Sequence, residues 1–152
     1  MIDAQQYCTF FLDGLFFGIQ VQKVQEVIRY QEMTRVPLAP PEVSGLINLR
    51  GQIVTAIDLR RRLKLGERPP GCSPVNVVVQ TDDGAVSLLV DEIGDVLTVP
   101  ESAFERPPDT LRGTARELIR GAYKIENRLL LVLDTARTVS LSGNGKAYEP
   151  TE

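Results

Sequence analysis

The chain has 152 residues, of which 43% are hydrophobic and 24% charged, a composition typical of a globular domain large enough to bury a core. Its formal net charge of −3 argues against a general binder of nucleic acids or anionic membranes. No apolar run approaches the length of a membrane span and the first residues lack the pattern of a signal peptide, so we expect a soluble cytoplasmic protein without membrane insertion.

Short strands joined by turns are the predicted elements, because apolar residues alternate over short stretches and the chain holds 12 glycines and 10 prolines. The first half is predicted to contain a hairpin over 7–21, an irregular strand over 24–28, a proline loop at 37–41, a hairpin over 45–57 and a short helix over 59–63. The second half is predicted to contain a hairpin over 75–90, a proline loop at 100–108, a stretch at 111–118 that is either helix or coil, a hairpin over 121–133 and a short helix over 135–140. A break rich in proline and glycine at 66–74 is expected to join the two halves.

The two halves follow one pattern. When the sequence is shifted by 76 residues, Gly45 meets Gly121 and Asp58 meets Asp134 with no gap between them. A shift of 69 residues superposes the aliphatic residues of 19–28 on those of 88–97. We therefore predict an all-β fold, a single domain over 1–152 made of two similar lobes at about 15–65 and 75–141. The N-terminal strand would complete either lobe, and 142–152 would form a flexible tail.

The chain has no histidine, which removes the Ser-His-Asp and Cys-His nucleophile arrangements and histidine-containing zinc sites. No glycine-rich phosphate loop is present. The two cysteines, Cys8 and Cys72, lack a metal or redox spacing and are interpreted as reduced, passive thiols. We expect neither a cofactor nor a metal.

An aspartic-type hydrolase is the sharpest enzymatic alternative, because Asp58 and Asp134 end equivalent strands of the two halves and such enzymes share one proton between two carboxylates. Leu59 and Arg60, however, stand where small residues would let the carboxylates approach. Helix capping explains both aspartates without catalysis.

A cluster of cations covers residues 60–62 and Lys64 on the first short helix. It is interpreted as a solvated face whose side-chain stems cover apolar surface. No aromatic residues interleave the charges, which argues against RNA binding.

Polar positions that differ between the halves are candidates for function, since the shared scaffold does not require them. Arg50 meets Glu126 and Asn48 meets Lys124, whereas Glu26 meets another carboxylate, Asp95, and is interpreted as structural in part.

The residues in these segments resemble the CheW family of chemotaxis coupling proteins. The matching motifs are Val24-Gln25-Glu26-Val27, Asn48-Leu49-Arg50-Gly51, Asp58-Leu59-Arg60 and Val90-Asp91-x-Ile93, and the resemblance covers nearly all of 6–141. It implies two SH3-like five-stranded β-barrel lobes with a few short helices. It also implies a non-enzymatic adaptor that links the cytoplasmic tips of chemoreceptors to the regulatory domain of the histidine kinase CheA.

The resemblance also implies site residues. The receptor-binding set is Val24, Glu26, Val27, Asn48 and Arg50, near the groove between the lobes, and the kinase-binding set is Val36 and Gly45. Flagellar chemotaxis and pilus or surface sensing both remain open as pathways. The alternatives are the hydrolase and an SH3-like peptide-binding module outside chemotaxis.

Overall fold

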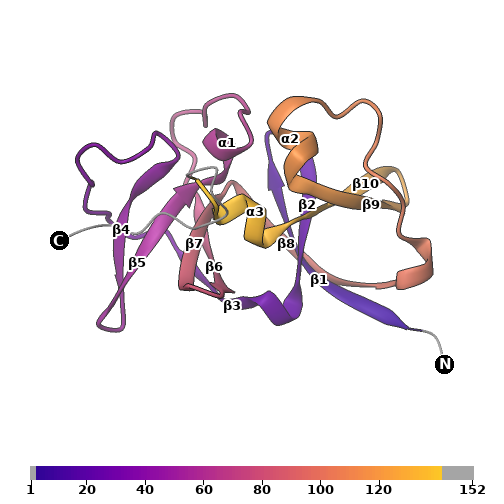
Figure 1. Ribbon diagram of the computed structural model, residues 1–152, viewed down its shortest axis with the longest axis horizontal. Coiled ribbons are helices and arrows are strands. Elements are labelled where there is room, and N and C mark those ends of the chain that lie inside the picture. The colour runs from indigo at the N-terminus through magenta and orange to yellow at the C-terminus, as the bar shows by residue number, and fades with distance from the viewer. Residues whose placement is uncertain (1–2, 142–152) are drawn as a thin grey trace.

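The structure is a computed structural model that describes residues 3–141, and it consists mainly of β-strands (Figure 1). The strands are β1 (Ala4–Leu12), β2 (Leu15–Gln20), β3 (Val24–Arg29), β4 (Val43–Leu49), β5 (Gln52–Asp58), β6 (Val75–Thr81), β7 (Gly84–Val90), β8 (Glu92–Pro100), β9 (Ile119–Ile125) and β10 (Arg128–Leu133). The helices are α1 (Leu59–Arg62), α2 (Gly113–Leu118) and α3 (Thr135–Val139), with single 3₁₀ turns η1 (Val21–Lys23) and η2 (Glu101–Ala103). The stretch left open between helix and coil contains α2, and the predicted tail at 142–152 lies outside the described residues.

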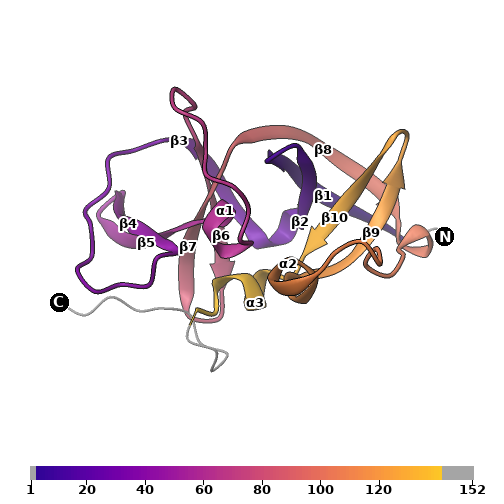
Figure 2. The same cartoon turned by 90° about the horizontal axis from the view of Figure 1, so that it is seen from above.

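Two five-stranded sheets form the two lobes, which confirms the predicted fold class. One sheet has the order β3-β6-β7-β5-β4 and is built from residues 24–90, and we call it the central lobe. The other has the order β8-β1-β2-β10-β9, from residues 4–20 and 92–133, and we call it the terminal lobe. Figures 1 and 2 show the lobes side by side with α3 between them.

The sheets do not follow the expected division at 15–65 and 75–141. Two parallel pairings, β5 with β7 and β2 with β10, join strands that the repeat places in different halves. The N-terminal strand β1 pairs with β2 and β8, so it completes the terminal lobe. A repeat shows which hairpins resemble each other, but it carries no information on which strands lie next to each other, and the predicted boundaries failed for that reason.

Each sheet curls toward closure through a single bridge. The segment that leaves β3 pairs with β4 through Thr34 and Leu46, and the segment that leaves β8 pairs with β9 through Glu105 and Ala122. The repeated glycines lie beside these bridges: a Cβ on Gly45 would lie 2.7 Å from the Thr34 carbonyl oxygen, and one on Gly121 would clash with Phe104 and Glu105. Close approach of two backbones therefore explains why glycine recurs here.

The buried apolar residues of 3–141 form three clusters, one inside each lobe and a larger one between the lobes. The cluster between the lobes takes residues from both sheets, including Phe10, Phe17, Val77 and Leu88. Along β10, successive residues alternate between the interior of the terminal lobe and the core between the lobes. Strands buried on both faces read as continuous apolar runs, which is why 129–133 shows no polar alternation.

Both repeated aspartates cap short helices, as predicted. The Asp58 carboxylate accepts the backbone N–H of Arg60 at 3.1 Å, and the Asp134 carboxylate accepts that of Arg137 at 3.0 Å. Asp58 also lies 3.5 Å from the Arg68 guanidinium and Asp134 lies 3.8 Å from that of Arg137. Each carboxylate is thus engaged by its own helix and an arginine, and this geometry gives no support to a shared-proton dyad.

Asp134 is the cleaner of the two caps to test. Because asparagine caps a helix about as well as aspartate, Asp134→Asn should leave the free energy of unfolding nearly unchanged, whereas Asp134→Ala should lower it by about 0.5–2 kcal/mol. Urea denaturation of the two variants beside the wild type measures both effects. An asparagine variant as unstable as the alanine variant would show that the carboxylate charge, rather than the cap, stabilises this helix.

Candidate functional site

The tip of the β4–β5 hairpin holds Arg50 in a fixed position. Leu49 pairs with Gln52 across a two-residue turn, and Arg50 and Gly51 both have positive φ, 53° and 85°. These values fit the type I′ turn that suits the twist of a hairpin. The Asn48 side-chain oxygen accepts the Gly51 N–H at 2.8 Å, so Asn48 braces the turn that presents Arg50.

Arg50 forms a bidentate ion pair with Glu26 on β3. Its Nη1 and Nη2 donate to Glu26 Oε2 and Oε1 at 2.6 and 2.7 Å. The hydrogen bonds from Arg50 lower the pKa of Glu26, and the carboxylate in turn raises the pKa of Arg50. The Arg50 side chain is still 72% exposed, so the pair fixes the guanidinium in place without hiding it.

A short polar chain extends this pair along the sheet. The Gln25 side-chain amide donates to Glu26 at 3.3 Å, and the Gln80 amide on β6 donates to Gln25. Polar groups from β6, β3 and the hairpin tip therefore form one connected surface.

The two faces of β3 present different chemistry. A register shift between Val24 and Glu26 puts Val24 and Val27 on one face of the strand and Glu26 on the other. Val24 and Val27 pair with Val79 and Val77, which belong to the core between the lobes. Glu26 pairs with Val78, which lies inside the central lobe. Of the predicted receptor-binding residues, Glu26 and Arg50 thus form an ion pair and Asn48 supports the turn that carries Arg50. Val24 and Val27 lie on the opposite face of β3.

Apolar side chains are exposed on the edge strands of both lobes. β3 and β8 are each the first strand of a sheet, and Val27 on β3 is 43% exposed while its repeat counterpart Val96 on β8 is 56% exposed. Val96 pairs with Cys8, whose partner on the other side is Ile19 of the core between the lobes. Sequence reasoning missed Val96, although the 69-residue repeat contained the signal.

The predicted kinase-binding residues differ in accessibility. Val36 lines an open hollow of about 1010 Å³ on the central lobe, walled by prolines of the 37–41 and 69–74 segments. Leu38 lines the same hollow and is fully exposed. Gly45 is buried at the bridge with Thr34, where it lets the two backbones approach.

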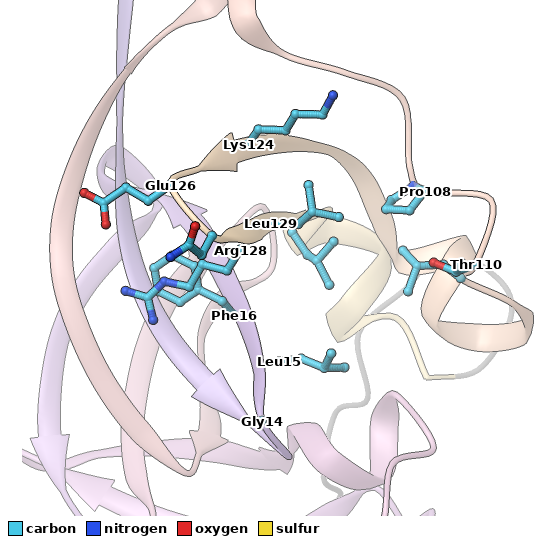
Figure 3. Close-up of a pocket in the computed structure, with 12 residues that line it drawn as sticks. Gly14, Leu15, Phe16, Pro108, Thr110, Lys124, Glu126, Arg128 and Leu129 are labelled. Atoms are coloured by element: carbon cyan, nitrogen blue, oxygen red, sulfur yellow. The ribbon is translucent and has the colours of Figure 1, made fainter.

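A second hollow, of about 560 Å³, lies on the terminal lobe and was not predicted (Figure 3). Figure 3 shows Leu15 and Leu129 facing the opposite loop at Pro108 and Thr110. The Arg128 guanidinium lies 4.2 Å from the ring centroid of Phe16 at its rim, a cation–π contact.

Comparison with known proteins decides the family. A CheW-like domain model matches residues 6–142. The chain is 35% identical over 131 residues to the chemotaxis protein CheW of Bacillus subtilis (strain 168), covering 86% of this chain and 84% of that protein. It is 30% identical over 139 residues to the CheW of Treponema pallidum (strain Nichols), covering 89% and 82%.

The chain belongs to the CheW family. The crystal structure of the scaffolding protein TtCheW from Thermoanaerobacter tengcongensis has the same fold, with a TM-score of 0.85 and 24% identity over 98% of this chain and 100% of that one. The predicted family and the predicted class, a chemotaxis coupling adaptor, are confirmed. Within residues 3–141, no helix is long and apolar enough to cross a membrane.

Proposed function

We propose that this CheW-family chain couples the cytoplasmic tips of chemoreceptors to the regulatory domain of the histidine kinase CheA, without enzymatic activity of its own. The observation that carries the proposal is the Arg50–Glu26 pair, an exposed guanidinium held by the edge strand β3, whose other face exposes Val27. Arginine is enriched at binding hot spots, where its planar fork makes several directed hydrogen bonds.

The receptor-facing surface of this proposal runs along β3. Val27 supplies exposed apolar area and Val24 supports it from the core between the lobes. Arg50, braced by Asn48 and Glu26, supplies the polar contact at the hairpin tip. Val96 extends this surface to the terminal lobe, since it is the exposed counterpart of Val27 on the other edge strand. A receptor tip that touches both valines would span the two lobes.

The kinase-facing surface of this proposal is the proline-walled hollow of the central lobe. Val36 lines it and Leu38 projects fully into solvent, a position typical of an apolar anchor that is buried only when a partner binds. Gly45 acts here indirectly, because its close approach to Thr34 holds the loop that carries both side chains. The adaptor would act at the cytoplasmic face of receptor arrays, where both partners are present.

Two variants separate the two surfaces in a binding experiment. Purified wild type is expected to retain both a chemoreceptor cytoplasmic fragment and the CheA regulatory domain in a pull-down. Arg50→Ala should lose binding to the receptor fragment and keep binding to the kinase domain. Leu38→Ala should weaken binding to the kinase domain and keep binding to the receptor fragment. If the wild type binds neither partner, under conditions where a known coupling protein binds both, the proposal is wrong. Binding of a proline-rich peptide instead would favour the SH3-like module outside chemotaxis.

A further inference from the structure

Two of the three cations of α1, Arg60 and Arg62, do not belong to the solvated face that the sequence suggested, whereas Arg61 is exposed. The Arg60 side chain is only 8% exposed, and the half-buried Arg62 donates three hydrogen bonds to backbone carbonyl oxygens. Lys64, two residues further, is exposed. One turn of helix therefore directs two of its arginines into the protein.

Arg62 binds the end of α3. Its Nε donates to the Thr138 carbonyl oxygen at 2.7 Å, and its Nη2 donates to the carbonyl oxygens of Arg137 and Ser140 at 2.8 and 3.0 Å. The last carbonyls of a helix lack partners within the helix and carry partial negative charge, which a guanidinium satisfies. Burial lowers the pKa of Arg62, but an arginine stays protonated in proteins, so the contact keeps its charge.

This contact crosses from one lobe to the other. α1 follows β5 of the central lobe, and α3 follows β10 of the terminal lobe. Figures 1 and 2 both show α3 between the two sheets, in line with that position.

Arg60 anchors the same helix turn to the crossover between the lobes. Its Nε donates to both Asp91 oxygens at 2.9 and 3.0 Å, and Asp91 lies between β7 of the central lobe and β8 of the terminal lobe. The Asp13 N–H, in the β1–β2 turn of the terminal lobe, donates to the same carboxylate at 3.0 Å.

The repeat shows that the fold does not require these cations. With the 76-residue shift, Arg60 meets Ala136 and Arg62 meets Thr138, the residue whose carbonyl it binds. Two equivalent helices thus meet between the lobes. Arg61 of α1 meets Arg137 of α3, whereas the positions of Arg60 and Arg62 hold no cation in α3. Polar positions that differ between equivalent elements are free to be specialised.

We infer that Arg62, anchored by Arg60, is a positioning residue that fixes the mutual orientation of the two lobes. The apolar core between the lobes is held by a non-directional force, whereas three directed hydrogen bonds from one guanidinium define an angle. The inference rests on the proposed function in one respect: a receptor tip that spans Val27 and Val96 needs the lobes in a set orientation. The kinase-facing hollow lies on the central lobe alone and does not need it.

The test measures the distance between the lobes directly. Spin labels are placed on exposed turns of the two lobes through Asp83→Cys and Asn127→Cys, with Cys8 and Cys72 replaced by alanine and serine. Pulsed electron paramagnetic resonance then gives the distance distribution. Arg62→Gln is compared with Lys64→Gln, which removes a cation two residues away. Arg62→Lys keeps the charge but loses the planar fork, and it serves where Arg62→Gln does not fold.

Arg62→Gln is expected to broaden or shift the distance distribution, Arg62→Lys to do so in part, and Lys64→Gln to leave it as in the wild type. In titrations below the melting temperature, Arg62→Gln should lower the affinity for the receptor fragment on the order of tenfold, the usual scale of coupling between sites. Its affinity for the kinase domain should not change. An unchanged distribution in both folded Arg62 variants would overturn the inference, even if receptor binding fell. If the Arg62 variants change the distance distribution but the wild type binds no receptor fragment, the positioning role is supported and the proposed function is refuted.

Discussion

Replacing Asp91 by alanine is expected to lower the free energy of unfolding by about 3–5 kcal/mol, the cost of leaving one member of a buried ion pair without its partner. The Asp91 carboxylate is 18% exposed and accepts hydrogen bonds from Arg60, from Arg68 at 3.0 Å and from the Asp13 N–H. Arg60 is 8% exposed, and without Asp91 its remaining side-chain partners within residues 3–141 are the Gly66 and Glu67 carbonyl oxygens and the Asp13 carboxylate at 3.6 Å.

Urea denaturation at neutral pH measures this loss, and Asp109→Ala, which removes an exposed loop carboxylate, is the matched control. The control should change the free energy of unfolding by no more than about 0.5 kcal/mol, as surface substitutions usually do. A loss below about 1 kcal/mol in Asp91→Ala would show that the network is no stronger than an exposed pair.

The same carboxylate predicts how stability depends on pH. Burial raises the pKa of Asp91, but the hydrogen bonds from Arg60, the Asp13 N–H and Arg68 together outweigh burial, so the pKa lies below its usual value. A lowered folded-state pKa contributes stability that is present above the unfolded pKa of about 3.9 and is lost as pH falls through the folded value. The difference in stability between the wild type and Asp91→Asn should therefore be full at neutral pH and shrink below about pH 4.

Local structure was predictable from the sequence because it depends on neighbouring residues. Asp58 precedes a helical turn and Gly51 ends a hairpin, and both roles follow from capping and turn chemistry within a few residues. The repeat located Gly45 and Gly121 as scaffold, and the structure gives the reason, the close approach of another segment at each sheet closure.

Long-range pairing was not predictable in this way. Nothing near β2 in the sequence says that it lies beside β10, and that parallel pairing decides which strands make up each lobe. The role of Arg62 was not predicted for the same reason, since its hydrogen-bond partners lie 75 to 78 residues further along the sequence. A charged residue on a short helix is usually solvated, and only the opposite lobe shows that this one is not.

The candidate site was found in part through what the two halves do not share. Arg50 stood out because Glu126 occupies the equivalent turn, and the structure adds the bidentate contact with Glu26 that the sequence did not establish. Val96 was passed over because it matches Val27, and matching positions were interpreted as scaffold. Its 56% exposure on an edge strand shows that a repeated residue can also form surface.

Replacing Arg50 by alanine is expected to weaken binding to the receptor fragment by about 1–3 kcal/mol, the range of a hot-spot truncation. The fold should hardly respond, with a change in the free energy of unfolding within about 0.5 kcal/mol, because the side chain is 72% exposed and its ion pair is at the surface. Arg50→Lys should not restore binding, since a single ammonium group cannot make the paired contacts of a guanidinium fork.

Two further variants separate a direct contact from a supporting one. Glu126→Ala changes the equivalent turn of the terminal lobe, where φ is 48°, and should leave receptor binding as in the wild type. Glu26→Ala should weaken binding as well, because Arg50 then loses the carboxylate that holds it in place. Calorimetric titrations against a receptor fragment, with thermal melts as the check on folding, distinguish these cases. Wild-type affinity in a folded Arg50→Ala variant would place the receptor contact away from this hairpin, whereas loss in Arg50→Ala without loss in Glu26→Ala would make the guanidinium itself the contact and the ion pair dispensable.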